Sequence, residues 1–136
     1  MTKTALLVFT AFATIAPAAA SEEAPARNSS IGFPSVAAAL EALRARKDVN
    51  ISVQGGWTVV SERDGLTLWS FTPKGHPAYP AVVKRAAFVQ RDGAWFVNMN
   101  ALCEAEKAPC DKLMQDFRGL NEQMRQSLER SHKANH

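Results

Sequence analysis

The chain is organised around one segment, Leu68-Trp69-Ser70-Phe71-Thr72-Pro73-Lys74-Gly75-His76-Pro77-Ala78-Tyr79-Pro80-Ala81-Val82-Val83-Lys84-Arg85. Two apolar runs rich in β-branched and aromatic residues flank a ten-residue loop, 72–81, which holds three of the seven prolines and the only tyrosine. Such runs are typical of strands. Proline restricts the unfolded chain, so a loop of this composition loses less entropy when it is ordered. The segment therefore predicts two strands joined by a stiff loop that holds His76 and Tyr79 in a fixed position.

Three further strands are predicted around this pair. In chain order the five strands cover residues 49–54, 57–62, 66–71, 82–91 and 94–99. Gly55-Gly56, Arg63-Asp64-Gly65 and Asp92-Gly93 are turn signals at three of the four junctions. Because parallel neighbours need long crossover connections, these short turns predict an antiparallel meander.

A helix is predicted on each side of the strands in sequence. Pro34 suits the first position of a helix, and Ser35 is an alternative cap. After a linker at 102–110, in which Pro109 interrupts helical structure, an apolar stripe predicts a second helix from Asp111 to about Ser131. We therefore expect an α+β fold, a five-stranded antiparallel meander flanked in sequence by an N-terminal and a C-terminal helix. The simplest packing has two layers, with both helices on one face of the sheet.

The alternation of apolar residues along the strands predicts a core under the two helices and a second, more open apolar face. The competing interpretation is that the face that each strand buries is assigned wrongly. An open apolar face would be a surface for a partner or ligand. The expected core residues are Leu40, Leu43, Ile51, Val53, Val59, Leu68, Phe88, Phe96, Phe117 and Leu120, and the expected second face holds Trp69, Phe71, Val83, Val89 and Trp95.

The first twenty residues read as a cleaved secretory signal peptide. Lys3 precedes a twelve-residue apolar run, and Ala18 and Ala20 fit the small-residue cleavage pattern, so the mature chain is expected to start at Ser21. Twelve apolar residues are too few to span roughly 30 Å of hydrocarbon. We expect a periplasmic or secreted protein without a membrane span in its mature form. The expected divisions are a signal peptide at 1–20, a flexible leader at 21–31, a single α+β domain at 32–131 and a frayed tail at 132–136.

Cys103 and Cys110 are the only two cysteines. An even number of cysteines in a small exported domain favours a disulfide. A metal pair or a catalytic thiol would need partners, and no histidine lies nearby in sequence. We predict a disulfide and no metal site.

The charge balance does not favour nucleic acid. The chain has 16 basic and 13 acidic residues, and Lys3 leaves with the signal peptide. No run of lysine or arginine exceeds two residues, so no nucleic-acid partner is predicted.

Binding is the function that we expect of the loop and the adjoining sheet. Aromatic and arginine residues supply most hot spots at protein interfaces. Neighbouring strand residues point to opposite faces, so Lys84 and Arg85 cannot both join the surface of the loop. The competing interpretation is that His76 and Tyr79 only pin the loop to the fold. The candidate binding residues are Lys74, His76, Tyr79, Lys84, Arg85 and Trp69.

The segment 72–80, together with the signal peptide and the late cysteine pair, resembles small exported proteobacterial proteins of unassigned function. The resemblance implies a periplasmic, bacterial setting, and it implies no activity. We therefore expect an exported, non-enzymatic binding domain that recognises an unknown protein or peptide of the cell envelope, with no cofactor and no catalytic residue.

Two other functions stay open. One is a small-molecule or anion-binding protein that uses His76, Tyr79 and Lys84 or Arg85. The other, which we favour least, is a hydrolase centred on His76, with Ser70 as nucleophile and Asp64 or Asp92 as orienting acid. The sequence lacks the G-x-S-x-G elbow, the H-E-x-x-H helix and the phosphate-binding glycine loop that would support an enzyme.

Overall fold

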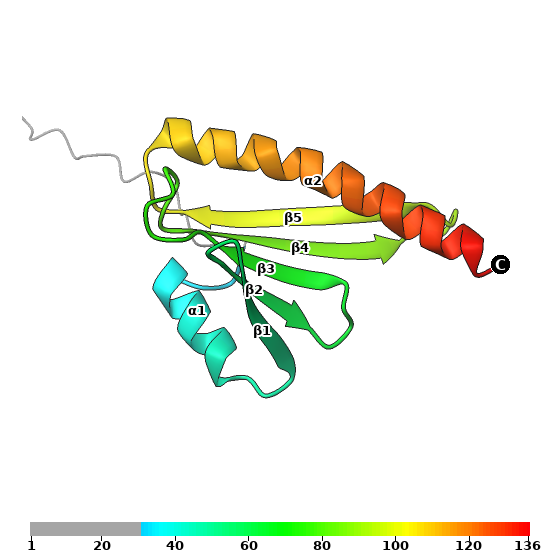
Figure 1. Cartoon of the computed structure of the whole chain (residues 1–136), viewed down its shortest axis with the longest axis horizontal. Helices are drawn as coiled ribbons and strands as arrows, with labels where there is room; N and C mark the ends of the chain where they lie inside the picture. Colours follow the sequence, from blue (N-terminus) through cyan, green and yellow to red (C-terminus); the bar gives the residue numbers. More distant parts are fainter. Residues whose placement is uncertain (1–30) are drawn as a thin grey trace, which may run out of the picture.

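The computed structural model describes residues 31–136, which form a five-stranded sheet and two helices (Figure 1). The expected signal peptide and residues 21–30 of the expected leader lie outside the described residues. Ile31, the last residue of that leader, is buried in the core. The elements are α1 (Val36–Ala45), β1 (Val49–Gln54), β2 (Trp57–Glu62), β3 (Thr67–Phe71), β4 (Ala81–Val89), β5 (Trp95–Cys103) and α2 (Lys107–Ala134).

The sheet is the predicted antiparallel meander. Its strands lie in the order β1-β2-β3-β4-β5, and every neighbouring pair is antiparallel. Gly55 and Gly56 join β1 to β2 with φ angles of 57° and 83°, the left-handed conformation that a two-residue hairpin turn requires at both central positions. This turn pairs Gln54 with Trp57 and so sets the register of the hairpin. The α+β class and the helix–meander–helix order are therefore confirmed.

The two helices cover opposite faces of the sheet, which differs from the expected packing of both on one face. Val82 belongs to a core cluster with Ala39 and Leu43 of α1, whereas its neighbour Val83 belongs to a second cluster with Phe117 of α2. Successive residues of a strand point to opposite faces. The structure thus has three layers, with the sheet between α1 and α2 (Figure 1).

The expected core was partly wrong for the same reason. Leu43 and Phe117 are buried, but other members of the list are exposed: Ile51, Val53, Phe88, Phe96 and Leu120. The residues expected on the more open face include the fully covered Trp69, Phe71 and Val83. Each helix covers only part of its face, so the buried positions are those that lie beneath a helix.

The predicted ends of the last two elements also shift. β5 continues to Cys103, which pairs with Ala81, instead of ending at Met99. α2 begins at Lys107 rather than Asp111 and runs to Ala134, into the segment expected to be a frayed tail. Pro109 lies in the first turn of α2, where backbone N–H groups have no partner within the helix, so the proline costs no hydrogen bond there.

The predicted disulfide joins these two elements. Cys103 ends β5, Cys110 lies in the first turn of α2, and their Sγ atoms are 2.05 Å apart. The bond therefore fixes where α2 leaves the sheet. Within residues 31–136 no helix is long and apolar enough to cross a membrane.

Candidate functional site

The proline loop folds as two consecutive turns. His76 N donates to the Pro73 carbonyl at 3.1 Å, and Gly75 supplies the positive φ of 89° that this turn requires at its third position. Tyr79 N then donates to the His76 carbonyl at 2.9 Å, with Pro77 at the second position, where its fixed φ suits a turn. The loop is thus ordered by its own backbone, as its composition predicts.

Thr72 and Ala81 close the base of the loop. Thr72 N donates to the Ala81 carbonyl at 3.0 Å, and Ala81 N donates to the Thr72 hydroxyl at 2.9 Å. The hydroxyl therefore takes the place of a backbone carbonyl at the last rung of the β3–β4 pair. Both residues are buried, so water does not compete for these bonds.

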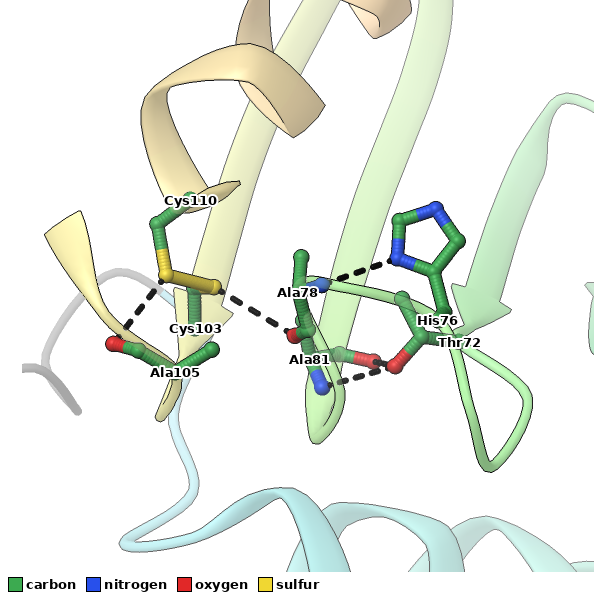
Figure 2. Close-up of a disulfide and its surroundings, with 7 residues drawn as sticks. All are labelled: Thr72, His76, Ala78, Ala81, Cys103, Ala105 and Cys110. Carbon is green, nitrogen blue, oxygen red and sulfur yellow. Dashed lines mark hydrogen bonds between the residues drawn. A yellow bond between two sulfur atoms is a disulfide. The ribbon is translucent and has the colours of Figure 1, made fainter. Parts of the chain in front are cut away.

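The disulfide lies against the other side of the loop (Figure 2). Cys103 Sγ is 3.6 Å from the Ala78 carbonyl oxygen. An oxidised cysteine has no S–H to donate, so this is a packing contact rather than a hydrogen bond. Ala78 is completely buried, and its N–H donates to His76 Nδ1 at 3.0 Å. Ala78 therefore lies between the disulfide and the His76 ring (Figure 2).

Between the loop, that face of the sheet and α2 lies an open groove of about 300 Å³. Its volume is at the lower end of the range for small-ligand pockets. Most of its walls are apolar or aromatic. The lining residues are Gln54, Trp57, Val59, Ser70, His76, Arg85, Leu113, Asp116, Phe117 and Leu120.

Three rings form one wall of this groove. The ring centroids of Trp57 and His76 are 5.1 Å apart in an edge-to-face arrangement, and those of Trp57 and Phe117 are 5.8 Å apart. Such contacts favour a fixed orientation of each ring. The bond from Ala78 N also fixes the tautomer of His76: because Nδ1 accepts, Nε2 carries the proton of the neutral ring.

Arg85 brings a positive charge into the groove without a counterion. Its guanidinium carbon lies 5.1 Å from the centroid of the Phe117 ring, a cation–π contact. Its Nε is inaccessible to solvent and has no hydrogen-bond partner among residues 31–136. Burial lowers the pKa of Arg85, since the charged form is removed from water. The arrangement leaves a half-buried cation that the described part of the chain does not neutralise.

Asp116 is the one acidic residue that lines the groove, and its carboxylate is already paired. Lys112 Nζ lies 3.0 Å from Asp116 Oδ1 and 3.1 Å from Oδ2 on the outer surface of α2. No ion pair joins Asp116 to Arg85 in the described structure.

The structure divides the six predicted binding residues. Only His76 and Arg85 line the groove. Trp69 and Lys84 lie on the opposite face, where Lys84 Nζ is 4.8 Å from the centroid of a buried Trp69 whose Nε1 donates to Glu62.

Tyr79 and Lys74 lie elsewhere on the loop. Tyr79 is exposed and lines a separate pocket beside α1, and Lys74 is exposed at the tip of the loop. Lys84 and Arg85 do point to opposite faces, as their adjacent positions in a strand predict.

Sequence reasoning missed the aromatic wall of the groove. Phe117 and Leu120 belong to the predicted apolar stripe of α2, and both were assigned to the core. The helix buries Phe117, but it leaves Leu120 43% exposed at the rim. Trp57 follows the Gly55-Gly56 turn, and the short turn brings it close to the loop: a Cβ on Gly56 would lie 3.5 Å from Pro73 Cβ.

No family model, curated protein or solved structure matches this chain. Among residues 31–136 there is also no group of three side chains suited to hold a metal ion.

Proposed function

We propose that this chain is an exported, non-enzymatic binding domain that holds a segment of a peptide or protein in the groove between the proline loop, the sheet and α2. The observation that carries the proposal is the combination of an open aromatic wall with a half-buried cation that has no counterion. Apolar pockets with a few convergent polar groups are the usual form of ligand sites. The uncompensated charge of Arg85 favours a partner with anionic character.

The setting that we propose is the bacterial periplasm, with a partner in the cell envelope. The disulfide supports this setting, because disulfides form and persist in oxidising compartments. The signal-peptide pattern at 1–20, and the resemblance to small exported proteins that includes it, support the same setting.

The geometry of His76 argues against the hydrolase alternative. A general base needs a free nitrogen lone pair directed at the nucleophile. His76 Nδ1 already accepts a hydrogen bond from Ala78 N, which leaves Nε2 as a donor in the neutral ring. No hydrogen bond joins His76 to Ser70, Asp64 or Asp92 in the part of the chain that is described. The Asp64 carboxylate accepts from Leu66 N and Thr67 N, and Asp92 Oδ1 accepts from Ala94 N, so both acids serve their own turns. This geometry supports a role for His76 as a hydrogen-bond donor to a ligand.

The test is site-specific photocrosslinking in the native periplasm. A photoreactive residue at Leu120, on the rim of the groove, should crosslink to a partner. Leu120→Glu should abolish capture of that partner, because a charged side chain would replace the apolar rim. The crosslinked peptides would be identified by mass spectrometry, and binding of the identified segment would be measured with the purified protein.

Val53 supplies the matched control. It is an exposed apolar residue on the α1 side of the sheet, away from the groove. A photoreactive residue at Val53 should not capture the partner, and Val53→Glu should leave its capture unchanged. Equal crosslinking from both positions, or no capture from Leu120, would contradict the proposed function. Capture of a small molecule in place of a peptide would favour the alternative.

A further inference from the structure

We propose that the groove recognises the free C-terminal carboxylate of a peptide whose last residue is apolar, with Arg85 as the group that pairs with the carboxylate. This inference rests on the proposed function and names the class of ligand.

Arg85 carries a charge that no acidic residue of the described structure neutralises. A guanidinium presents its donors in a rigid fork that matches the two oxygens of a carboxylate. In the described structure Arg85 has an aromatic ring beneath it, a solvent-inaccessible Nε without a partner, and no acidic partner. Buried charges are normally paired, because leaving one uncompensated is costly. A carboxylate bound in the groove would pair with the two terminal nitrogens of Arg85, because Nε itself is closed to solvent.

Other polar side chains share the groove with Arg85. Nε2 of neutral His76 is a donor, since Nδ1 is occupied, and Ser70 offers a hydroxyl. The amide nitrogen of Gln54 already donates one hydrogen bond to Ser52 Oγ at 3.1 Å, which leaves its second N–H as a donor. The only carboxylate in the lining is the one that Lys112 already holds. Arg85 and Nε2 of neutral His76 therefore offer the groove two donors without an acceptor, which suits an acceptor-only group such as an ionised carboxylate.

The groove is small enough to restrict the kind of ligand that it can hold. Its volume of about 300 Å³ is small, and Trp57, Phe117 and Leu120 share it with Arg85. The ligand must then present an apolar group and a carboxylate side by side within a short span. A C-terminal residue carries both on one Cα atom. An internal acidic residue carries its carboxylate on one side chain and needs a neighbour to supply the apolar one.

The experiment measures binding of defined peptides to the exported protein. The probes are short glycine–serine peptides that end in leucine or phenylalanine, each made with a free carboxylate and with a C-terminal amide. A third peptide has an internal glutamate and an amidated end. Calorimetry would give the dissociation constants, and NMR shifts of the Trp57 indole would show whether the groove is occupied. The free acids should bind roughly ten- to hundredfold more tightly than the amides, the usual effect of a charge-assisted hydrogen bond.

Variants of Arg85 connect the preference to this side chain. Arg85→Gln should remove the preference for the free acid, and Arg85→Lys should keep part of it, because a lysine retains the charge but not the fork. Lys84→Gln is the matched control. It removes the same charge from the adjacent residue, whose side chain lies on the opposite face over Trp69, and it should leave binding unchanged.

The outcomes separate this inference from the proposed function. Equal binding of acid and amide, or an unchanged preference in Arg85→Gln, would overturn the carboxylate assignment and leave groove binding intact. Equal binding of the internal-glutamate peptide would overturn the C-terminal assignment. No binding by any peptide would also overturn the inference, while capture from Leu120 would still decide the proposed function. If Arg85→Gln fails to fold, the comparison of acid with amide on the unmodified protein remains decisive.

Discussion

Replacing Thr72 by valine should destabilise the protein through the two hydrogen bonds between its hydroxyl and the Ala81 backbone. The hydroxyl accepts from Ala81 N and donates to the Ala81 carbonyl at 3.3 Å. Valine has nearly the shape of threonine, so it leaves no cavity, but it removes the oxygen that accepts from Ala81 N at 2.9 Å. Ala81 is fully buried, and its N–H would lose its partner. A buried, unsatisfied donor costs roughly 1–3 kcal/mol. With an unfolding entropy of about 2.1 cal/mol/K per residue over about 100 residues, a cost of about 2 kcal/mol lowers Tm by about 10 °C.

Thr72→Ser is the matched control, because it keeps the hydroxyl and removes only the methyl group. Loss of one buried methyl costs about 0.8 kcal/mol, so the serine variant should be the more stable of the two. Urea denaturation would give the free energies of unfolding. Hydrogen exchange should show faster exchange of the Ala81 amide in Thr72→Val alone. If Thr72→Val is as stable as the unmodified protein, the hydroxyl does not stabilise the loop. The same conclusion follows if the free energies of unfolding of Thr72→Val and Thr72→Ser agree within the error of repeated measurements.

Three further predictions concern stability. Replacing both Cys103 and Cys110 by serine should cost about 2.5 kcal/mol, the loop-entropy value for an eight-residue ring, seen as a lower urea midpoint; an unchanged midpoint would contradict it. Phe117→Ala should cost about 3 kcal/mol or more, and Leu120→Ala about 1 kcal/mol or less, because only Phe117 is buried; equal losses would show that the rim is packed. The Arg125 guanidinium donates hydrogen bonds to Glu122 and lowers the pKa of Glu122 to about 2 from an ordinary 4.5. The contribution of Glu122 to stability is therefore present above pH 4.5 and lost as the pH falls through 2. Glu122→Gln should flatten the fall in urea midpoint over that range, and an identical pH profile would contradict the assignment.

The order of the strands could be predicted from the turns. The length of a turn also determines which residues of the two strands pair. A two-residue turn at Gly55-Gly56 pairs Gln54 with Trp57, and counting outward places Ile51 opposite Val60. Val60, which is fully buried, therefore shares a face with Ile51. Grouping Ile51 with Val59 ignored this count, because the apolar pattern of β2 is continuous and does not itself select a face.

The choice of which face each helix covers could not be read from the strands. Both faces of the central strands are apolar, as adjacent Val82 and Val83 illustrate, and this is the pattern of strands buried on both sides. A sheet of this kind requires cover on each face. Placing both helices on one face would have left one of these two valines exposed to solvent.

Of the predicted site, His76 and Arg85 share the groove because the proline loop and β4 bring them to the same face. The alternation along β4 predicted that only one of Lys84 and Arg85 would join the loop, but it did not select which one. Trp57 and Phe117 could not be assigned to the groove in advance. Their burial depends on how far α2 extends over the sheet, and the start of α2 is fixed by the disulfide between Cys103 and Cys110.

The same contacts that pin His76 to the fold also leave one of its nitrogens available for binding, so the two interpretations of the loop are compatible. The hydrogen bond from Ala78 N to Nδ1 is the contact that fixes His76, and the same bond leaves Nε2 of the neutral ring as a donor at the wall of the groove. Trp57 holds the ring from one side. A histidine without these contacts would exchange tautomers and rotamers, and a ligand would have to order it on binding, which lowers affinity. Pinning the loop is therefore the means by which this fold presents a preorganised donor beside Arg85.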